Sequence, residues 1–315
     1  MSARAQAAVP TLAVLCAGAA LVAVAIGPTG WHAPWSADEL LTALRAPRVL
    51  LAALVGASLA LAGVAMQAVL RNDLADPWVL GLSGGATVGA VVSLALAPGL
   101  PPGPAAAVGA SGAAALVRVL ARGPYHPSRL LLAGVVVGAL LASATGMVLV
   151  LAPEGRLMRS ATFWLFGGLG HPSWGALVAP ALLLVASVAW LRWRAARLDR
   201  LSLGDDVATT LGVEVAPLRR GVLLVAVLLT ASAVAVGGLI GFVGLIAPHA
   251  ARRLVGASHR SLVLAAPLLG ALLLVCADTV ARSAFAPREL PVGLLTAALG
   301  GPLFLWQLSR GGAWS

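Results

Sequence analysis

The amino-acid sequence predicts an all-α, multi-pass membrane protein with about ten transmembrane helices. Its mean hydropathy is +0.97 over 315 residues, and only 10% of the residues are charged. Apolar runs of about 20 residues, the length that crosses the hydrocarbon core of a bilayer, recur along the whole sequence. We therefore expect residues 1–315 to form a single transmembrane domain.

The apolar runs and the polar breaks between them predict the individual spans. The first run, residues 10–27, has the character of a signal peptide, but no convincing small-residue cleavage site follows it, so we interpret it as a retained span. The other nine spans are expected at residues 49–70, 79–97, 104–121, 129–152, 174–192, 221–237, 240–254, 261–281 and 291–308.

The basic residues, all 21 of them arginine, are unevenly distributed between the two sides that ten spans define. With the N-terminus inside, fifteen arginines lie on the cytoplasmic side and six on the outer side, as the positive-inside rule requires. We therefore expect both termini in the cytoplasm. The net charge of +10 is then explained by membrane topology, and we expect no nucleic-acid partner.

The complete absence of lysine excludes several kinds of function. A phosphate-binding Walker loop and a Schiff base with pyridoxal phosphate or retinal both need that side chain. We expect the chain to be no enzyme and to bind no cofactor, so that any ATP and Mg²⁺ are used by another subunit. Cys16 and Cys276 lie within apolar runs, and no pair of side chains has the spacing of a metal site, so we assign none.

Glycines recur at every fourth position in several spans, as at Gly81, Gly85 and Gly89. On a helix this spacing forms a flat face that lets two backbones approach closely. We expect such faces to pack helices together in preference to contacting a ligand.

Arginines on the outer side need an explanation of their own, because the positive-inside rule disfavours them. Arg45 and Arg48 lie in the segment LRAPR, and Arg282 and Arg288 lie at another outer turn. Two explanations remain open. The guanidinium groups pair with carboxylates of a partner protein, or the side chains reach out to lipid headgroups.

The polar segment LSLGDDVATTLGV, residues 201–213, predicts a short amphipathic helix on the cytoplasmic side. It has two carboxylates for the first helical turn, an apolar stripe at i and i+4, and a glycine where the helix should end. These are Asp205, Asp206, Val207, Leu211 and Gly212. Such a helix contacts a cytoplasmic protein or lies on the lipid headgroups.

Three long segments resemble a known family. They are LRAPRVLLAALVGASLALAGVAMQAVLRNDLADPWVLGLSGGATVGA, GLIGFVGLIAPHAARRLVGASHR and ADTVARSAFAPRELPVGLLTAALGGPLFLW. They are similar to the permease subunits of bacterial importers for iron siderophores, haem and vitamin B12. These are the type II ATP-binding-cassette (ABC) importers of the FecCD family, and the resemblance covers nearly the whole chain in order.

The resemblance implies an assembly in the bacterial inner membrane. A homodimer or pseudo-dimer of ten-span subunits would form the translocation path at the interface between its two subunits. Two ATPase subunits would lie below it, and a periplasmic or lipid-anchored substrate-binding protein would dock above it. The chain would alternate between inward-open and outward-open states as the ATPases close and open.

The resemblance also implies roles for particular residues. Glutamates of the binding protein would meet Arg45, Arg48 and Arg282, with Arg288 as an additional candidate. Residues 201–220 would correspond to the coupling helices, with ATPase contacts at Gly204, Asp205, Asp206, Val207 and Leu211. Two strips would close the cytoplasmic mouth of the path, at Asn72 and Leu74 and at Pro127 and Ser128.

The substrate is narrowed only to a class. The segment TFWLFGGLG, residues 162–170, is most similar to haem and ferric-siderophore permeases, with a cobalamin importer as the alternative. An ion-coupled secondary transporter is a rival of a different kind. It would need carboxylates in the middle of the spans, and only Asp278 lies within a span, near its outer end.

Overall fold

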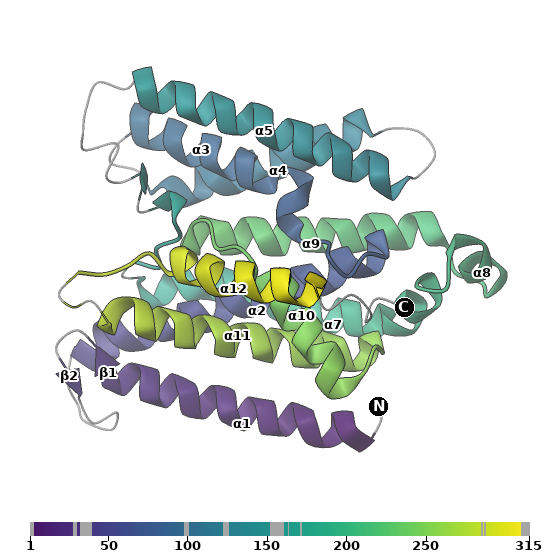
Figure 1. Ribbon diagram of the computed structural model, residues 1–315, viewed down its shortest axis with the longest axis horizontal. Helices are drawn as coiled ribbons and strands as arrows, with labels where there is room; N and C mark the ends of the chain where they lie inside the picture. Colours follow the sequence, from purple (N-terminus) through teal and green to yellow (C-terminus); the bar gives the residue numbers. More distant parts are fainter. Residues whose placement is uncertain are drawn as a thin grey trace.

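The computed structural model describes residues 3–27, 30–31, 40–97, 101–121, 126–151, 161–162, 164–170, 172–284, 286 and 288–309. Most of these residues are helical, and the helices run roughly along one direction (Figure 1). In chain order the main helices are α1 (Ala3–Ala25), α2 (Ala46–Leu70), α3 (Leu82–Leu96), α4 (Pro102–Leu120), α5 (Pro127–Leu151), α7 (Trp174–Leu201), α9 (Val215–Gly237), α10 (Val243–Val255), α11 (His259–Ser283) and α12 (Val292–Ser309).

The remaining elements are short. Strands β1 (Ile26–Gly27) and β2 (Gly30–Trp31) form an antiparallel pair in which Ile26 lies opposite Trp31. A π-helical turn, η1 (Leu40–Arg45), leads into α2, and a 3₁₀ turn, η2 (Pro77–Leu80), leads into α3. Helix α8 (Asp205–Thr210) has six residues.

The fold is that of an all-α, multi-pass membrane protein, as the sequence predicts. Every expected span overlaps one of the main helices, with ends that differ by up to nine residues. Among the described residues, seven helices are long and apolar enough to cross a bilayer, namely α1, α2, α4, α5, α7, α9 and α11. Helix α3 and residues 292–302 of α12 are apolar but shorter.

The eighth expected span, residues 240–254, differs from the prediction in its form. Helix α10 begins only at Val243 and has 13 residues, about 20 Å of helix, which is less than the hydrocarbon thickness. The chain before it is not helical, because Gly238 and Phe242 both have φ +67. The Leu239 N–H donates to the carbonyl of Trp164 at 3.4 Å, so protein covers this irregular backbone.

Helix α2 is the core of the bundle. Nearly all of its residues are buried, and it packs against α7, α9, α10 and α11 (Figure 1). Its sequence is apolar on every face between Val49 and Met66 except for Ser58. A helix of this kind is stable only when protein or lipid surrounds it completely.

Glycine allows the closest helix contacts, as the sequence predicts. A Cβ added at Gly85 of α3 would lie 2.2 Å from the carbonyl oxygen of Gly109 on α4. A Cβ at Gly56 of α2 would lie 2.2 Å from the carbonyl oxygen of Gly270 on α11. Both distances are far below van der Waals contact, so these glycines fix how closely the helices approach.

The predicted functional residues divide between the two ends of the bundle. The start of α1 and helix α8 lie at one end, which we call the α8 end, and strands β1 and β2 lie at the other, the β1–β2 end (Figure 1). Arg45 contacts the backbone at Ala25 and Gly30, at the β1–β2 end. Asp205 and Arg71 meet at the α8 end. The residues expected outside and inside are therefore separated by the length of the helices.

The glycine contact between α3 and α4 gives a direct test of the fold. We expect Gly85→Ala to destabilise the protein by about 1–3 kcal/mol, because the added methyl group must push α4 away. Thermal unfolding in mild detergent measures the effect. Gly112→Ala is the control, since a Cβ there has nothing within 4 Å. Equal melting temperatures for both variants would contradict the packing described here.

Candidate functional site

A buried carboxylate joins α2 and α11 at the β1–β2 end. Asp278 is 1% exposed and accepts hydrogen bonds from Nε and Nη2 of Arg48, at 3.2 and 3.1 Å. One helical turn further along α11, the Nε atom of Arg282 lies 3.6 Å from the second oxygen of Asp278. Loss of one partner would leave a buried charge uncompensated, so this triad holds the two helices together.

Glu289 adds a second carboxylate to this group. It lies just before α12, is partly exposed, and accepts a hydrogen bond from Nη1 of Arg48 at 2.9 Å. Arg48 therefore binds two carboxylates from two different segments, a geometry that suits the several donors of a guanidinium group. We call Arg48, Asp278, Arg282 and Glu289 the ionic cluster.

Two arginines also bind the C-terminal end of α1. The Nη2 group of Arg282 donates to the carbonyl of Ala23, and Nη1 of Arg45 donates to the carbonyl of Ala25 at 2.9 Å. The last carbonyls of a helix lack partners within the helix and carry partial negative charge, so cations stabilise them. Both side chains thus fasten α1 to the rest of the bundle.

The four arginines predicted to dock a binding protein therefore lie in different environments. Arg45 and Arg48 are each 5% exposed and Arg282 is 2% exposed, and groups of the same chain engage all three. Arg288 is exposed. Glu289 holds Arg48 in the way that a carboxylate of a partner would.

At the α8 end, the short helix α8 is fastened by ion pairs. Asp205 accepts a hydrogen bond from Nη2 of Arg219 on α9 at 2.8 Å, and Nη2 of Arg71 lies 3.8 Å from the same oxygen. Ala208 is fully buried against the chain. Six residues do not form a stable helix alone, so these contacts keep α8 in place.

The predicted apolar stripe of α8 faces away from the chain. Val207 is 44% and Leu211 48% exposed. The helix begins after Gly204 and ends before Gly212, and both glycines have positive φ. The expected coupling segment, residues 201–220, contains this one separate helix, since residue 201 ends α7 and residues 215–220 begin α9.

The loop after α2 carries the first predicted gate strip. Arg71 ends α2 with a left-handed φ of 47, and the side chain of Asn72 accepts a hydrogen bond from the N–H of Leu74 at 2.9 Å. Asp73 pairs with Arg252 of α10 at 3.1 Å. Arg252 also donates to the side chain of Gln67 on α2. Asn72 and Leu74 line a pocket of about 480 Å³ together with residues of α10 and α11.

Asp76 closes the same loop. Its carboxylate accepts a hydrogen bond from the N–H of Trp78 at 3.0 Å and caps η2. Burial raises the pKa of Asp76 to about 6, against the smaller opposing effect of that hydrogen bond. A Cβ added at Gly244 of α10 would lie 3.2 Å from the second oxygen of Asp76, so the two segments pack tightly here.

The second predicted gate strip lies apart from the first. Pro127 begins α5 and Ser128 is exposed. Their neighbours His126 and Leu130 line a separate groove between α4 and α9. The neighbours of the second strip therefore line a different pocket from the one that Asn72 and Leu74 line.

Sequence reasoning missed one polar contact at the α8 end. Asp199, near the end of α7, accepts a hydrogen bond from the backbone N–H of His259 at 2.8 Å, and its Oδ1 lies 2.7 Å from the His259 ring Nδ1. Although burial raises the pKa of Asp199, the hydrogen bonds from His259 outweigh this effect and hold the pKa below its ordinary value. The two residues are 60 positions apart, and no motif in the sequence connects them.

Some known proteins are similar to this chain in sequence, and a solved structure is similar to it in the arrangement of its helices. The FecCD transport family matches residues 10–310. The hemin transport system permease protein HmuU of Yersinia pestis is 41% identical over 275 residues, covering 85% of this chain and 82% of its own. The Fe(3+) dicitrate transport system permease protein FecD of Escherichia coli K12 is 41% identical over 311 residues, covering 93% and 95%.

Relatives with a different cargo are equally similar. The cobalamin import system permease protein BtuC of Halobacterium salinarum is 41% identical over 293 residues, covering 92% of this chain and 78% of its own. Among solved structures, an inward-facing conformation of a putative metal-chelate type ABC transporter superposes with a TM-score of 0.88 at 31% identity, covering 96% and 98%. With sequence and fold in agreement along nearly its whole length, the chain belongs to the FecCD transport family.

Proposed function

We propose that this permease carries an iron compound, haem or a ferric siderophore, delivered by a substrate-binding protein. The segment around residues 162–170 supports this cargo, as do relatives named for hemin and for ferric dicitrate. Cobalamin is the second candidate, because relatives named for it reach the same identity. As a permease of ABC importers, the chain works with a separate ATPase.

The observation that carries the contact with an ATPase is the exposed apolar stripe of α8. Val207 and Leu211 point away from a helix that Ala208 and Asp205 fasten to the chain. This arrangement suits a rigid contact with an ATPase groove, since movement of the partner would reach α9 directly through Arg219. It supports an orientation in which the α8 end, with the start of α1, faces the cytoplasm.

The ionic cluster argues against ion coupling. Asp278 contacts both Arg48 and Arg282, and its charge is balanced by cations of the protein itself. A carboxylate that takes up a transported proton or sodium ion needs to lose such partners during the cycle. The cluster instead suits a docking platform for the binding protein, with Arg288 as the exposed first contact and Glu289 holding Arg48 until a partner carboxylate replaces it.

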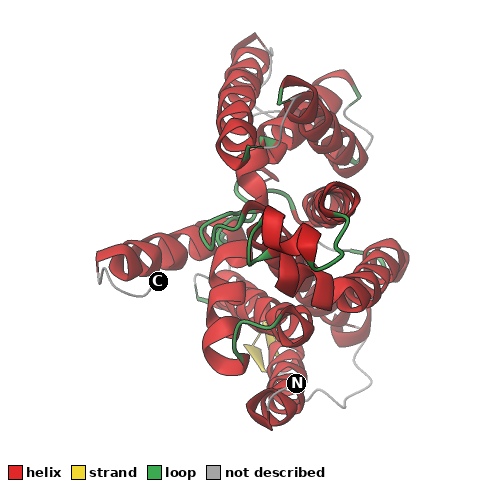
Figure 2. Cartoon of the chain, turned by 90° about the vertical axis from the view of Figure 1, so that its right-hand side faces the viewer, coloured by secondary structure: helices red, strands yellow, loops and turns green. Residues whose placement is uncertain are grey.

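We further propose that two copies of the chain form the translocation path. Helix α12 stands out from the side of the bundle (Figure 2). Leu294, Leu299 and Leu305 on it are 40%, 68% and 65% exposed, which leaves this helix open to contact with a second copy. The loop at Asn72 and Leu74 and the strip at Pro127 and Ser128 would close the cytoplasmic mouth between the two copies.

The α8 contact is tested by charge placed on its apolar stripe. We expect the double variant Val207→Glu, Leu211→Glu to lower the amount of copurifying ATPase subunit at least about tenfold, because burial of two apolar side chains is lost. Thr209→Glu is the control, since it adds a negative charge to the opposite flank of α8 and leaves the apolar stripe intact. Unchanged ATPase recovery in the double variant would remove α8 from the interface.

The cargo is tested by the complex itself. We expect the tagged permease, purified in mild detergent with its ATPase and binding protein, to transport a ferric chelate or haem into proteoliposomes and to leave cobalamin outside. An absorption spectrum of the purified complex separates the two iron cargoes, because haem gives a Soret band. Uptake of cobalamin alone would overturn the iron assignment while leaving the importer intact.

The docking platform is tested at its two most accessible residues. We expect Arg288→Glu to weaken binding-protein affinity about tenfold, with an effect that shrinks at high salt. Glu289→Gln should strengthen the affinity severalfold, because it removes the competing carboxylate while Asp278 still holds Arg48. Glu214→Gln, at the α8 end, is the control. If Glu289→Gln weakens binding instead, Glu289 is itself a docking contact.

A further inference from the structure

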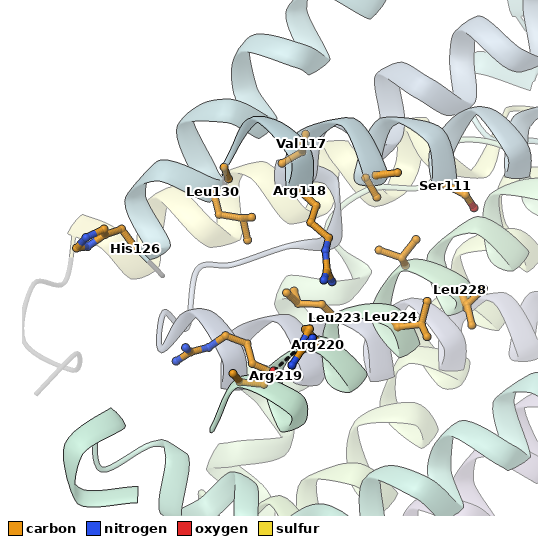
Figure 3. A pocket seen from close by; sticks show the side chains of 15 residues that line it. Ser111, Val117, Arg118, His126, Leu130, Arg219, Arg220, Leu223, Leu224 and Leu228 are labelled. Atoms are coloured by element: carbon orange, nitrogen blue, oxygen red, sulfur yellow. Dashed lines mark hydrogen bonds between the residues drawn. The ribbon is translucent and has the colours of Figure 1, made fainter. Parts of the chain in front are cut away.

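A groove lies between α4 and α9, apart from the ionic cluster and the first gate strip. Its volume is about 540 Å³, and the first residues of α5 complete one end of it. The residues that line it differ in polarity along its length (Figure 3). One end is basic, and the remainder is apolar. The lining set includes Arg118, His126, Arg219, Arg220, Leu224 and Leu228.

The basic end gathers positive charge from both walls. Arg118 on α4 and Arg220 on α9 both line the groove, and Arg118 extends toward α9 (Figure 3). Arg118 has no ion pair among the described residues, and Arg220 donates only to the carbonyl of Ala216 on its own helix, at 3.3 Å. The described residues that line the groove include no acidic side chain. Two guanidinium groups that face one space repel each other unless an anion lies between them.

The apolar part of the groove follows α9 away from these arginines. Leu223, Leu224, Val227 and Leu228 form a stripe at helical spacing that spans about 12 Å beyond Arg220. On the facing helix, Ala114, Ala115 and Val117 form the opposite apolar wall of the groove. A single occupant of this groove therefore has an anionic head and a long apolar tail.

We propose that the groove binds one anionic phospholipid of the leaflet at the α8 end. The phosphate lies between Arg118 and Arg220, since guanidinium groups bind phosphate oxygens through paired hydrogen bonds. An acyl chain lies along Leu224 and Leu228. A zwitterionic lipid fits less well, because its own cation would add to the repulsion.

The site has a link to α8. Arg219 lines the groove, and its Nη2 group donates to Asp205 of α8 at 2.8 Å. A phosphate next to Arg220 would stand one residue from the arginine that fastens α8. The bound lipid therefore sets the position of the helix that contacts the partner in the proposed function, although its binding does not depend on that function.

The test is lipid binding to the full-length permease alone, measured by native mass spectrometry in mild detergent with added phosphatidylglycerol or phosphatidylcholine. We expect the wild-type chain to retain one phosphatidylglycerol, and millimolar inorganic phosphate not to displace it, which separates a lipid from a free phosphate site. The double variant Arg118→Gln, Arg220→Gln should lose at least about tenfold in retained phosphatidylglycerol. Arg253→Gln, Arg260→Gln, two exposed arginines outside the groove, is the control.

A second variant tests whether the loss of lipid comes from the groove itself, and not from the loss of charge or from misfolding. Ala115→Trp keeps both arginines but fills the apolar part of the groove from its exposed position on α4, and it should also reduce lipid retention. Equal retention of the two lipids by the wild type, or undiminished retention by the Arg118, Arg220 variant, would overturn the proposal. If either variant changes the oligomeric state of the permease and leaves the amount of retained phosphatidylglycerol unchanged, a protein occupies the groove instead of a lipid. None of these measurements involves the ATPase or the cargo.

Discussion

The bundle depends on how closely α2 approaches its neighbours. A Cβ at Gly63 would lie 1.9 Å from the carbonyl oxygen of Gly244 on α10, and Gly56 meets Gly270 of α11 in the same way. In a membrane, apolar burial gives little reason for one helix to prefer another helix over lipid. Close backbone packing supplies the preference, and glycine makes that packing possible. With these contacts α2 is surrounded by four helices, and the other features are arranged around it.

The two candidate interfaces are the two ends of this same helix. Arg48, near the start of α2, holds the ionic cluster, while Gln67 near its end donates to the Gly244 carbonyl at 3.3 Å and accepts from Arg252. Arg71 follows directly and contacts Asp205 of α8. A helix of 25 residues, about 37 Å long and packed on all sides, transmits displacement with little bending. Events at the β1–β2 end and at the α8 end therefore share one rigid element.

Local features of the sequence predict much of this arrangement. The long spans, the stripe at Val207 and Leu211, the end of α8 before Gly212 and the packing role of Gly85 all depend on neighbouring residues, and all are confirmed. The predicted limits of the seventh span were too narrow, because α9 begins before the apolar part that hydropathy detects.

Most of the features that the sequence does not reveal are contacts between residues far apart in the chain. The contact between Arg48 and Asp278 joins positions 230 apart, so the sequence shows two outer charges but not that each satisfies the other. The contact of Asp199 with His259 is hidden for the same reason. The late start of α10 depends on Phe242, a residue whose positive φ no propensity favours.

The shortness of α10 has a consequence for biogenesis. A segment of 13 residues that carries Arg252 and Arg253 cannot enter the lipid on its own, whereas α2 and α11 are apolar and long enough to do so. Insertion of this protein therefore cannot proceed as a series of independent helices. The translocon must keep α10 near the interface until α2 is beside it, where Gln67 and Asp73 receive Arg252. Synthesis order supports this sequence of events, because α2 leaves the ribosome well before α10.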